Sequence, residues 1–172
     1  QEYVKMKLRL VKNCKKNNNV VYNEDDDTLK SILQNFPLKK STYGIKSSNH
    51  NFYLKDDAIY HSPSNTLFVK IKDIKLKGQH NLLNLLAAAT CADIYGIKID
   101  HIKNIFKTFK GIPHRIEYIT TIKGVDYIND SKATNIDSVI VALKTYNKPT
   151  ILLLGGVNKG VDFGLLAPHI KS

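Results

Sequence analysis

The spacing of apolar residues predicts alternating helices and strands along the first part of the chain. Residues 1–14 carry apolar side chains at helical spacing. Residues 80–95 are apolar nearly all round, so the helix that they form should be buried. The acids at 24–27 suit the start of a helix. In chain order we expect a helix at 1–14, a strand at 20–22, a helix from 23–27 to about 36, a small antiparallel β subdomain at 41–76, and helices at 80–95 and 101–109.

Glycine, proline and capping residues mark the ends of these elements. Gly96 should end the helix at 80–95 as a C-cap, and Asp100 should cap the helix at 101–109. Residues 111–113 (GIP) are typical of a linker and give a candidate domain boundary.

Beyond this boundary the pattern changes to a hairpin followed by a parallel α/β unit. We expect strands at 116–122 and 125–128 around a Lys123-Gly124 turn, a helix at 136–146, a strand at 150–154 and a helix from 163 onward. The sequence therefore predicts the α/β fold class.

The densest group of chemically active side chains lies between the second hairpin strand and the next helix. Residues 128–135 (INDSKATN) hold an acid, a base, two hydroxyls and two amides. Open α/β sheets bind ligands at such strand ends, and a helix start offers free N–H groups to an anion. Lys132 adds a cation, and Asp130 could orient a ribose, a metal or that lysine. The alternative is a helix cap with incidental charges; we favour the ligand site.

A second candidate site opens the apolar helix at 80–95. Asn81 and Asn84 are three residues apart and share a helix face, so their amides could meet a planar heterocycle such as adenine. The alternative is local capping by His80 or Asn81. Asn84 argues against it, because burying an unpaired amide costs about 1–3 kcal/mol.

Two further segments are candidates for binding anions. Arg115, beside the linker, could reach a phosphate or could equally form a structural ion pair. Residues 152–160 predict a buried strand, a glycine turn and a lysine, Lys159, that could hold a carboxylate or phosphate. The chain contains no G-x-x-x-x-G-K-[ST] loop.

Composition narrows the class of protein. The chain has 172 residues, 42% of them hydrophobic, with no apolar run of membrane-spanning length and no signal-peptide pattern. Cys14 and Cys91 have no metal or redox spacing and suit buried or incidental thiols in a reducing compartment. We therefore expect a cytoplasmic protein without a membrane partner.

The net charge of +11 has two interpretations. One is nucleic-acid binding. The other is a compositional bias toward Lys, Asn and Ile, with small anionic ligands as a secondary cause. The lysines are scattered and no aromatic platform accompanies them, so we expect no nucleic-acid partner.

With these residues in hand, the chain resembles the Mur ligases, and most closely their D-glutamate-adding branch. The resemblance rests on four segments in the family's order, and it covers essentially the whole chain. They are 78–88 (GQHNLLNLLAA), 111–117 (GIPHRIE), 127–135 (YINDSKATN), and 154–156 (LGG) with Lys159.

The resemblance implies the domains and the fold of each part. Residues 1–111 would be the later part of a P-loop-type, ATP-binding central domain with a small β subdomain. Residues 112–172 would be the first part of a Rossmann-like C-terminal domain.

The resemblance also implies a role for each candidate residue. Nucleotide contacts would come from Asn81, Asn84, Arg115 and Asp130, and acceptor contacts from His80, Lys132, Thr134 and Lys159. Thr134 and Lys159 would hold the carboxylates of D-glutamate, and Lys132 would also be catalytic. Residues 3–9 (YVKMKLR) resemble the segment with a carbamoylated lysine that positions magnesium, which makes Lys7 both the catalytic and the metal-binding candidate.

The implied reaction is an ATP- and Mg²⁺-dependent ligation in cytoplasmic peptidoglycan synthesis. D-glutamate would be joined to UDP-N-acetylmuramoyl-L-alanine through an acyl phosphate, by a monomer. We expect the chain to be a fragment, inactive alone, whose phosphate-binding loop precedes Gln1. The alternatives are another Mur ligase, a folylpolyglutamate synthase-like enzyme, or a non-enzymatic nucleotide-binding module.

Overall fold

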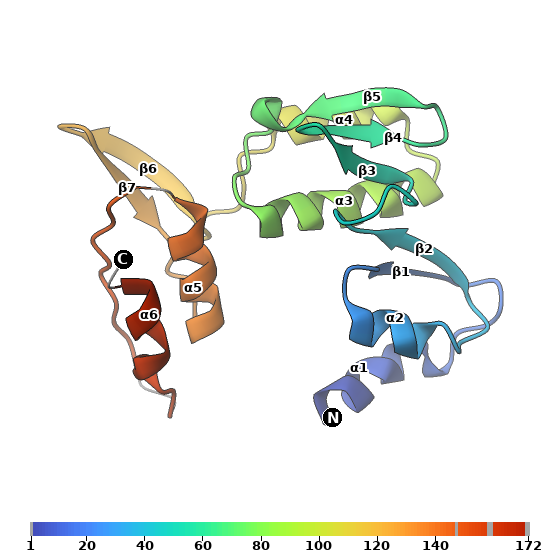
Figure 1. Ribbon diagram of the computed structural model, residues 1–172, viewed down its shortest axis with the longest axis horizontal. Helices are drawn as coiled ribbons and strands as arrows, with labels where there is room; N and C mark the ends of the chain where they lie inside the picture. The colour runs from blue at the N-terminus through green and yellow to red at the C-terminus, as the bar shows by residue number, and fades with distance from the viewer. Residues whose placement is uncertain (1, 147, 158–159, 171–172) are drawn as a thin grey trace. The chain divides into compact units, whose positions relative to one another are not determined.

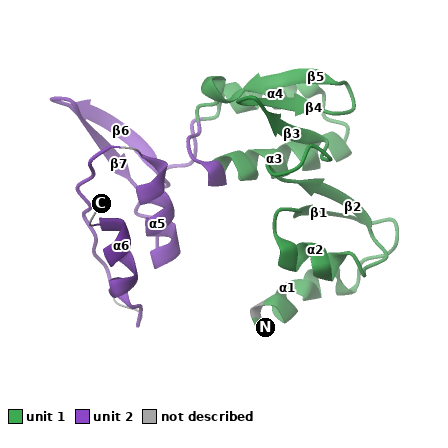
Figure 2. Ribbon diagram, viewed as in Figure 1, with its two compact units in different colours: residues 1–75, 81–109 green, residues 76–80, 110–172 purple. Residues whose placement is uncertain are grey.

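The computed structural model describes residues 2–146, 148–157 and 160–170. They form two compact units, shown in two colours in Figure 2: residues 1–75 with 81–109 (unit 1), and residues 76–80 with 110–172 (unit 2). Helices and small sheets occur in both units, so the α/β class is confirmed. No helix in the described ranges is long and apolar enough to cross a membrane.

The first sheet of unit 1 is a parallel β pair (Figure 1). After α1 (Glu2–Lys12), β1 (Asn19–Asn23) pairs in parallel with β2 (Lys39–Tyr43), and α2 (Asp27–Leu33) connects them. The helix expected from 23–27 starts after Asp26, whose carboxylate accepts from the Leu29 N–H at 3.0 Å. Residues 41–43 were expected in the antiparallel subdomain, and this was wrong. A helix separates β1 from β2, and a crossover of that kind joins parallel strands.

The antiparallel sheet of unit 1 is confirmed between residues 52 and 70. It contains β3 (Phe52–Lys55), β4 (Ala58–His61) and β5 (Thr66–Lys70), in that order, and the short 3₁₀ helix η1 (Ile71–Asp73) follows. Three phenylalanines form its core. Phe68 contacts Phe52 and Phe106 edge to face, each with ring centroids 5.0 Å apart, and all three are at most 2% exposed. Burying each ring contributes about 1.5–3 kcal/mol.

Two helices complete unit 1: α3 (Gln79–Ile94), whose first two residues belong to unit 2, and α4 (Ile99–Thr108). The C-cap at Gly96 is confirmed: its φ is +72°, and the Ile97 N–H donates to the Ala92 carbonyl at 3.0 Å. The cap expected at Asp100 was wrong, because the helix already begins at Ile99.

The expectation that α3 is buried all round was also wrong. Leu86 and Ala89 are fully buried, but Asn84, Ala88 and Cys91 are exposed along the opposite face. Within the described residues, only one side of this helix is therefore covered. Cys14 is exposed as well, so neither cysteine is a buried thiol.

Unit 2 is built on a hairpin of β6 (Glu117–Ile122) and β7 (Val125–Asn129). Lys123 (φ +49°) and Gly124 (φ +80°) form its turn, and positive φ at both positions matches the twist of the strands. The helix α5 (Ile136–Thr145), the 3₁₀ helix η2 (Phe163–Leu166) and α6 (Ala167–Ile170) follow.

The core of unit 2 is small. Ile136 and Val139 of α5 pack with Leu166, which is 1% exposed.

The strand expected at 150–154 is absent, which corrects the sequence prediction. Ile151 and Leu153 are 90% and 92% exposed, while Leu152 packs against the core. A strand needs a neighbour for its N–H and C=O groups. Among the described residues, β6 and β7 pair only with each other.

Candidate functional site

The turn between β7 and α5 carries the polar residues that the sequence singled out. Hydrogen bonds from its own side chains stabilise the turn. The Asn129 side-chain oxygen accepts from the Ser131 N–H at 3.1 Å. Asn135 caps α5, accepting from the Ser138 N–H at 2.8 Å. The capping alternative is thus confirmed for Asn135, and it leaves Asp130 and Lys132 available for other roles.

A second segment, residues 114–117, lies against this turn. The Ile116 N–H donates to Asp130 Oδ1 at 3.0 Å, and the Lys132 N–H donates to the His114 carbonyl at 3.0 Å. The His114 N–H donates to Glu117 Oε2 at 2.8 Å. Sequence segments more than ten residues apart therefore form one hydrogen-bonded structure in unit 2.

The backbone of this segment is strained. His114 and Ile116 have φ of +67° and +47°. A β-branched residue rarely adopts the left-handed region, and backbone strain gathers at functional sites. Arg115, which is exposed, stands between the two strained residues.

The pKa of His80 is shifted by burial and by the charges of nearby residues. Burial lowers the pKa of the half-buried His80, the positive charge of Arg115 lowers it further, and the negative charge of Asp130 raises it. The pKa of Tyr146, at the end of α5, is raised by burial and by the negative charges of Asp126 and Asp130. Arg115 and Asp130 of unit 2 therefore have opposite effects on the pKa of His80.

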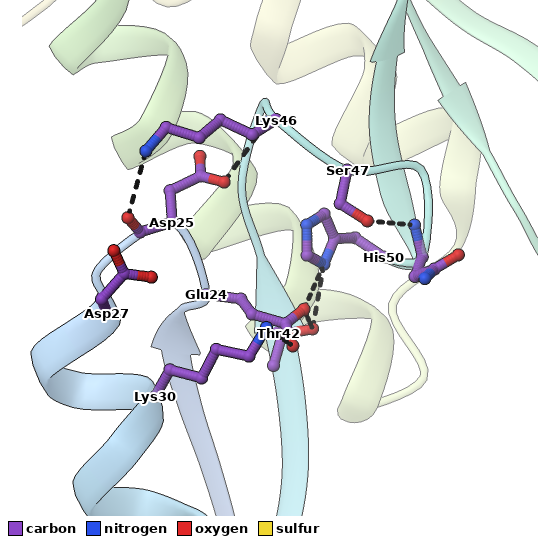
Figure 3. Close-up of a pocket in the computed structure, with 9 residues that line it drawn as sticks. Glu24, Asp25, Asp27, Lys30, Thr42, Lys46, Ser47 and His50 are labelled. Atoms are coloured by element: carbon purple, nitrogen blue, oxygen red, sulfur yellow. Dashed lines mark hydrogen bonds and ion pairs between the residues drawn. The ribbon is translucent and has the colours of Figure 1, made fainter.

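Unit 1 holds a separate cleft of about 410 Å³ at the carboxyl ends of β1 and β2 (Figure 3). The Asp25 carboxylate accepts from the Ile45 N–H at 2.7 Å, and Glu24 lies 3.5 Å from His50 Nδ1. A Cβ on Gly44 would lie 2.8 Å from Asp25 Oδ1 and 2.9 Å from His50 Nε2. The sequence analysis missed this cleft, although acids directly after a strand could have indicated it.

The sequence analysis gave no individual role to two residues of the unit 2 site, Glu117 and Asn129, although Asn129 belongs to the group at 128–135. They are directly opposite each other in the hairpin register, and each bonds to His114. Their position at the open end of a predicted hairpin, next to the candidate residues, was the available signal.

Comparison with known proteins shows the family of the chain. The Mur ligase middle domain matches residues 1–92, more than half of the chain. The chain belongs to the Mur ligase family.

The curated relatives are similar over the whole chain. UDP-N-acetylmuramoylalanine–D-glutamate ligases of Bacillus anthracis, Bacillus cereus (strain AH820) and Bacillus thuringiensis (strain Al Hakam) are each 36% identical over 173 aligned positions, which cover 100% of this chain. The match spans 38% of each relative's length. A solved UDP-N-acetylmuramoyl-L-alanyl-D-glutamate–2,6-diaminopimelate ligase is 24% identical, with a TM-score of 0.49, over 74% of this chain and 28% of that one.

Two other candidate residues of this Mur ligase chain, Asn81 and Asn84, lie on α3. Asn81 is half-buried in the first turns of α3, and Asn84 is exposed, so burial of an unpaired amide does not argue for its function. Both belong to unit 1. Their nucleotide contacts stay a prediction.

Lys132 and Thr134 are exposed in the turn before α5, where a ligand could reach both side chains. Lys159 lies outside the described residues. Lys7 is on the exposed surface of α1, and the described residues contain no group of three or more His, Cys, Asp or Glu able to hold a metal. The roles of these four residues also stay predictions.

Proposed function

We propose that this chain is part of an ATP-dependent ligase that joins D-glutamate to UDP-N-acetylmuramoyl-L-alanine in the cytoplasm. The observation that carries the proposal is the hydrogen bonding between the segment at 114–117 and the turn at Asp130 and Lys132, which holds the backbone of Arg115 against that turn. The similarity of the whole chain to D-glutamate ligases supports the choice of acceptor. The domain assignment is part of the proposal: residues 1–111 from the central domain and 112–172 from the C-terminal domain.

The unit 2 residues suit the two ends of a nucleotide. Arg115 offers a planar, permanently charged group for a phosphate, and the Asp130 carboxylate can accept from ribose hydroxyls. Asn81 and Asn84 would contact adenine.

The reaction would proceed in two steps. A carboxylate oxygen of the L-alanyl group attacks the γ-phosphorus of ATP, releasing ADP and forming an acyl phosphate. The D-glutamate amine then attacks the acyl carbon, loses a proton and displaces phosphate. Such a reaction needs positioned substrates and neutralised charge. Lys132 would supply charge, and His80, Thr134 and Lys159 would hold the acceptor.

Magnesium would balance the charge of the ATP phosphates. Carbamoylated Lys7 would help to position it.

The test is phosphate release by the full-length protein that carries this chain. We expect release that requires ATP, UDP-N-acetylmuramoyl-L-alanine and D-glutamate together, and that falls at least about a hundredfold in Lys132→Ala. Lys144→Ala, an exposed lysine on α5, is the matched control. Release with L-lysine or diaminopimelate, when UDP-N-acetylmuramoyl-L-alanyl-D-glutamate replaces UDP-N-acetylmuramoyl-L-alanine, would identify a different Mur ligase. Release with a folate acceptor would identify a folylpolyglutamate synthase-like enzyme.

A further inference from the structure

The strained segment around Arg115 is held by a pair of side chains with no role in the proposed reaction. Glu117 and Asn129 are cross-strand partners at the open end of the β6–β7 hairpin. Glu117 Oε2 accepts from the His114 N–H at 2.8 Å, and Asn129 Nδ2 lies 2.9 Å from His114 Nδ1. Both partners therefore act on the residue just before Arg115.

These contacts oppose the relaxation of the backbone. With φ at +67° and +47°, His114 and Ile116 would gain by returning to ordinary conformations. Bonds from Glu117 and Asn129 fix His114, and the bond to Asp130 fixes Ile116. Such strain persists only where the surroundings over-determine it.

We propose that Glu117 and Asn129 are positioning residues that hold Arg115 beside His80 and Asp130 for nucleotide binding. The nucleotide part of this inference rests on the proposed function; the positioning of Arg115 does not. Neither residue needs to touch the nucleotide.

The first test follows His80 by NMR in the 172-residue chain. Because the charge of Arg115 lowers the His80 pKa, Arg115→Gln should raise it. Glu117→Ala should raise it toward the same value, since the released segment takes Arg115 away. Glu117→Gln keeps an oxygen that accepts from the His114 N–H, so it should stay near wild type. Asn129→Ala supplies a second variant if Glu117→Ala fails to fold.

Two results would overturn the proposal. One is an unchanged His80 pKa in a folded Glu117→Ala or Asn129→Ala variant while Arg115→Gln raises it. The other is an unchanged pKa in Arg115→Gln, because Arg115 would then not be held beside His80.

The second test measures ATP affinity in the full-length protein. Glu117→Ala should weaken ATP binding roughly tenfold, about the loss of one well-aligned charged hydrogen bond, and Glu117→Gln should restore it. Equal affinity in wild type and Glu117→Ala would refute the positioning role in binding. If ATP does not bind wild type while the His80 shifts occur, the proposed function fails and the positioning of Arg115 stands.

Discussion

At the scale of single residues, Gly44 has little room for a larger side chain. Its backbone lies between the Asp25 carboxylate, which accepts two backbone N–H groups, and the buried His50. A methyl group would lie within 2.9 Å of both side chains. We expect Gly44→Ala to lower the free energy of unfolding by about 1–3 kcal/mol, the usual cost of overpacking. Urea denaturation measures it.

The matched control is Gly155→Ala. No atom lies within 4 Å of a Cβ at Gly155, and its φ is not in the left-handed region. Its unfolding free energy should stay within about 0.5 kcal/mol of wild type. Equal losses in both variants would show that the close contacts at Gly44 do not matter.

His80 makes the stability of the chain depend on pH. Its folded-state pKa is lowered from 6.5 by burial and by Arg115, so below that value the unfolded chain binds more protons than the folded one. The contribution of His80 to the free energy of unfolding is present above pH 6.5, and it is lost as the pH falls from 6.5 toward the pKa of His80 in the folded chain. Denaturation from pH 8 to 5 should show a steeper loss in wild type than in His80→Gln. Parallel pH profiles would contradict this expectation.

At the scale of elements, the cap of α5 can be separated from the ligand site next to it. Asn135→Ala removes the acceptor for the Ser138 N–H and should lower the free energy of unfolding by about 1 kcal/mol. Asn135→Asp keeps an acceptor and should cost less. Thr134→Ala, one residue earlier, should leave stability unchanged and impair only D-glutamate-dependent phosphate release in the full-length protein. A stability loss in Thr134→Ala would give Thr134 a structural role.

Local signals predicted the elements well. Gly96 and the Lys123-Gly124 turn need positive φ, so each could be recognised from the sequence, and both lie where we expected. The run at 150–154 shows the limit of such reasoning. Its apolar residues indicate burial, but a strand also needs a paired neighbour, and the described residues provide none for it.

The same limit applies to the site. Asp130 and Lys132 could be chosen from their density of functional groups between a strand and a helix. For Glu117 the sequence offered only its position at the end of the hairpin, because its importance comes from a bond to a backbone whose φ angles no local pattern predicted. The burial expected for Asn84 was wrong, because exposure along α3 depends on what packs against each face of the helix.

At the scale of the whole molecule, the division into two units predicts separate responses to core damage. Phe106 is 2% exposed in the aromatic core of unit 1, and Leu166 is 1% exposed in the core of unit 2. Truncation to alanine should cost about 3–5 kcal/mol for Phe106 and 2–5 kcal/mol for Leu166. Because the core of unit 2 is smaller, we expect a larger fraction of unit 2 to unfold in Leu166→Ala than of unit 1 in Phe106→Ala.

Hydrogen exchange with mass spectrometry would distinguish local from global unfolding, because peptides report each unit separately. Leu166→Ala should deprotect α5 and the β6–β7 hairpin and leave the β3–β5 sheet protected. Phe106→Ala should do the reverse. The two variants should change the His80 signal differently. Damage to unit 2 should return the His80 pKa toward 6.5, since Arg115, whose charge lowers it, belongs to that unit. Loss of protection across the whole chain in either variant would mean that the units fold as one.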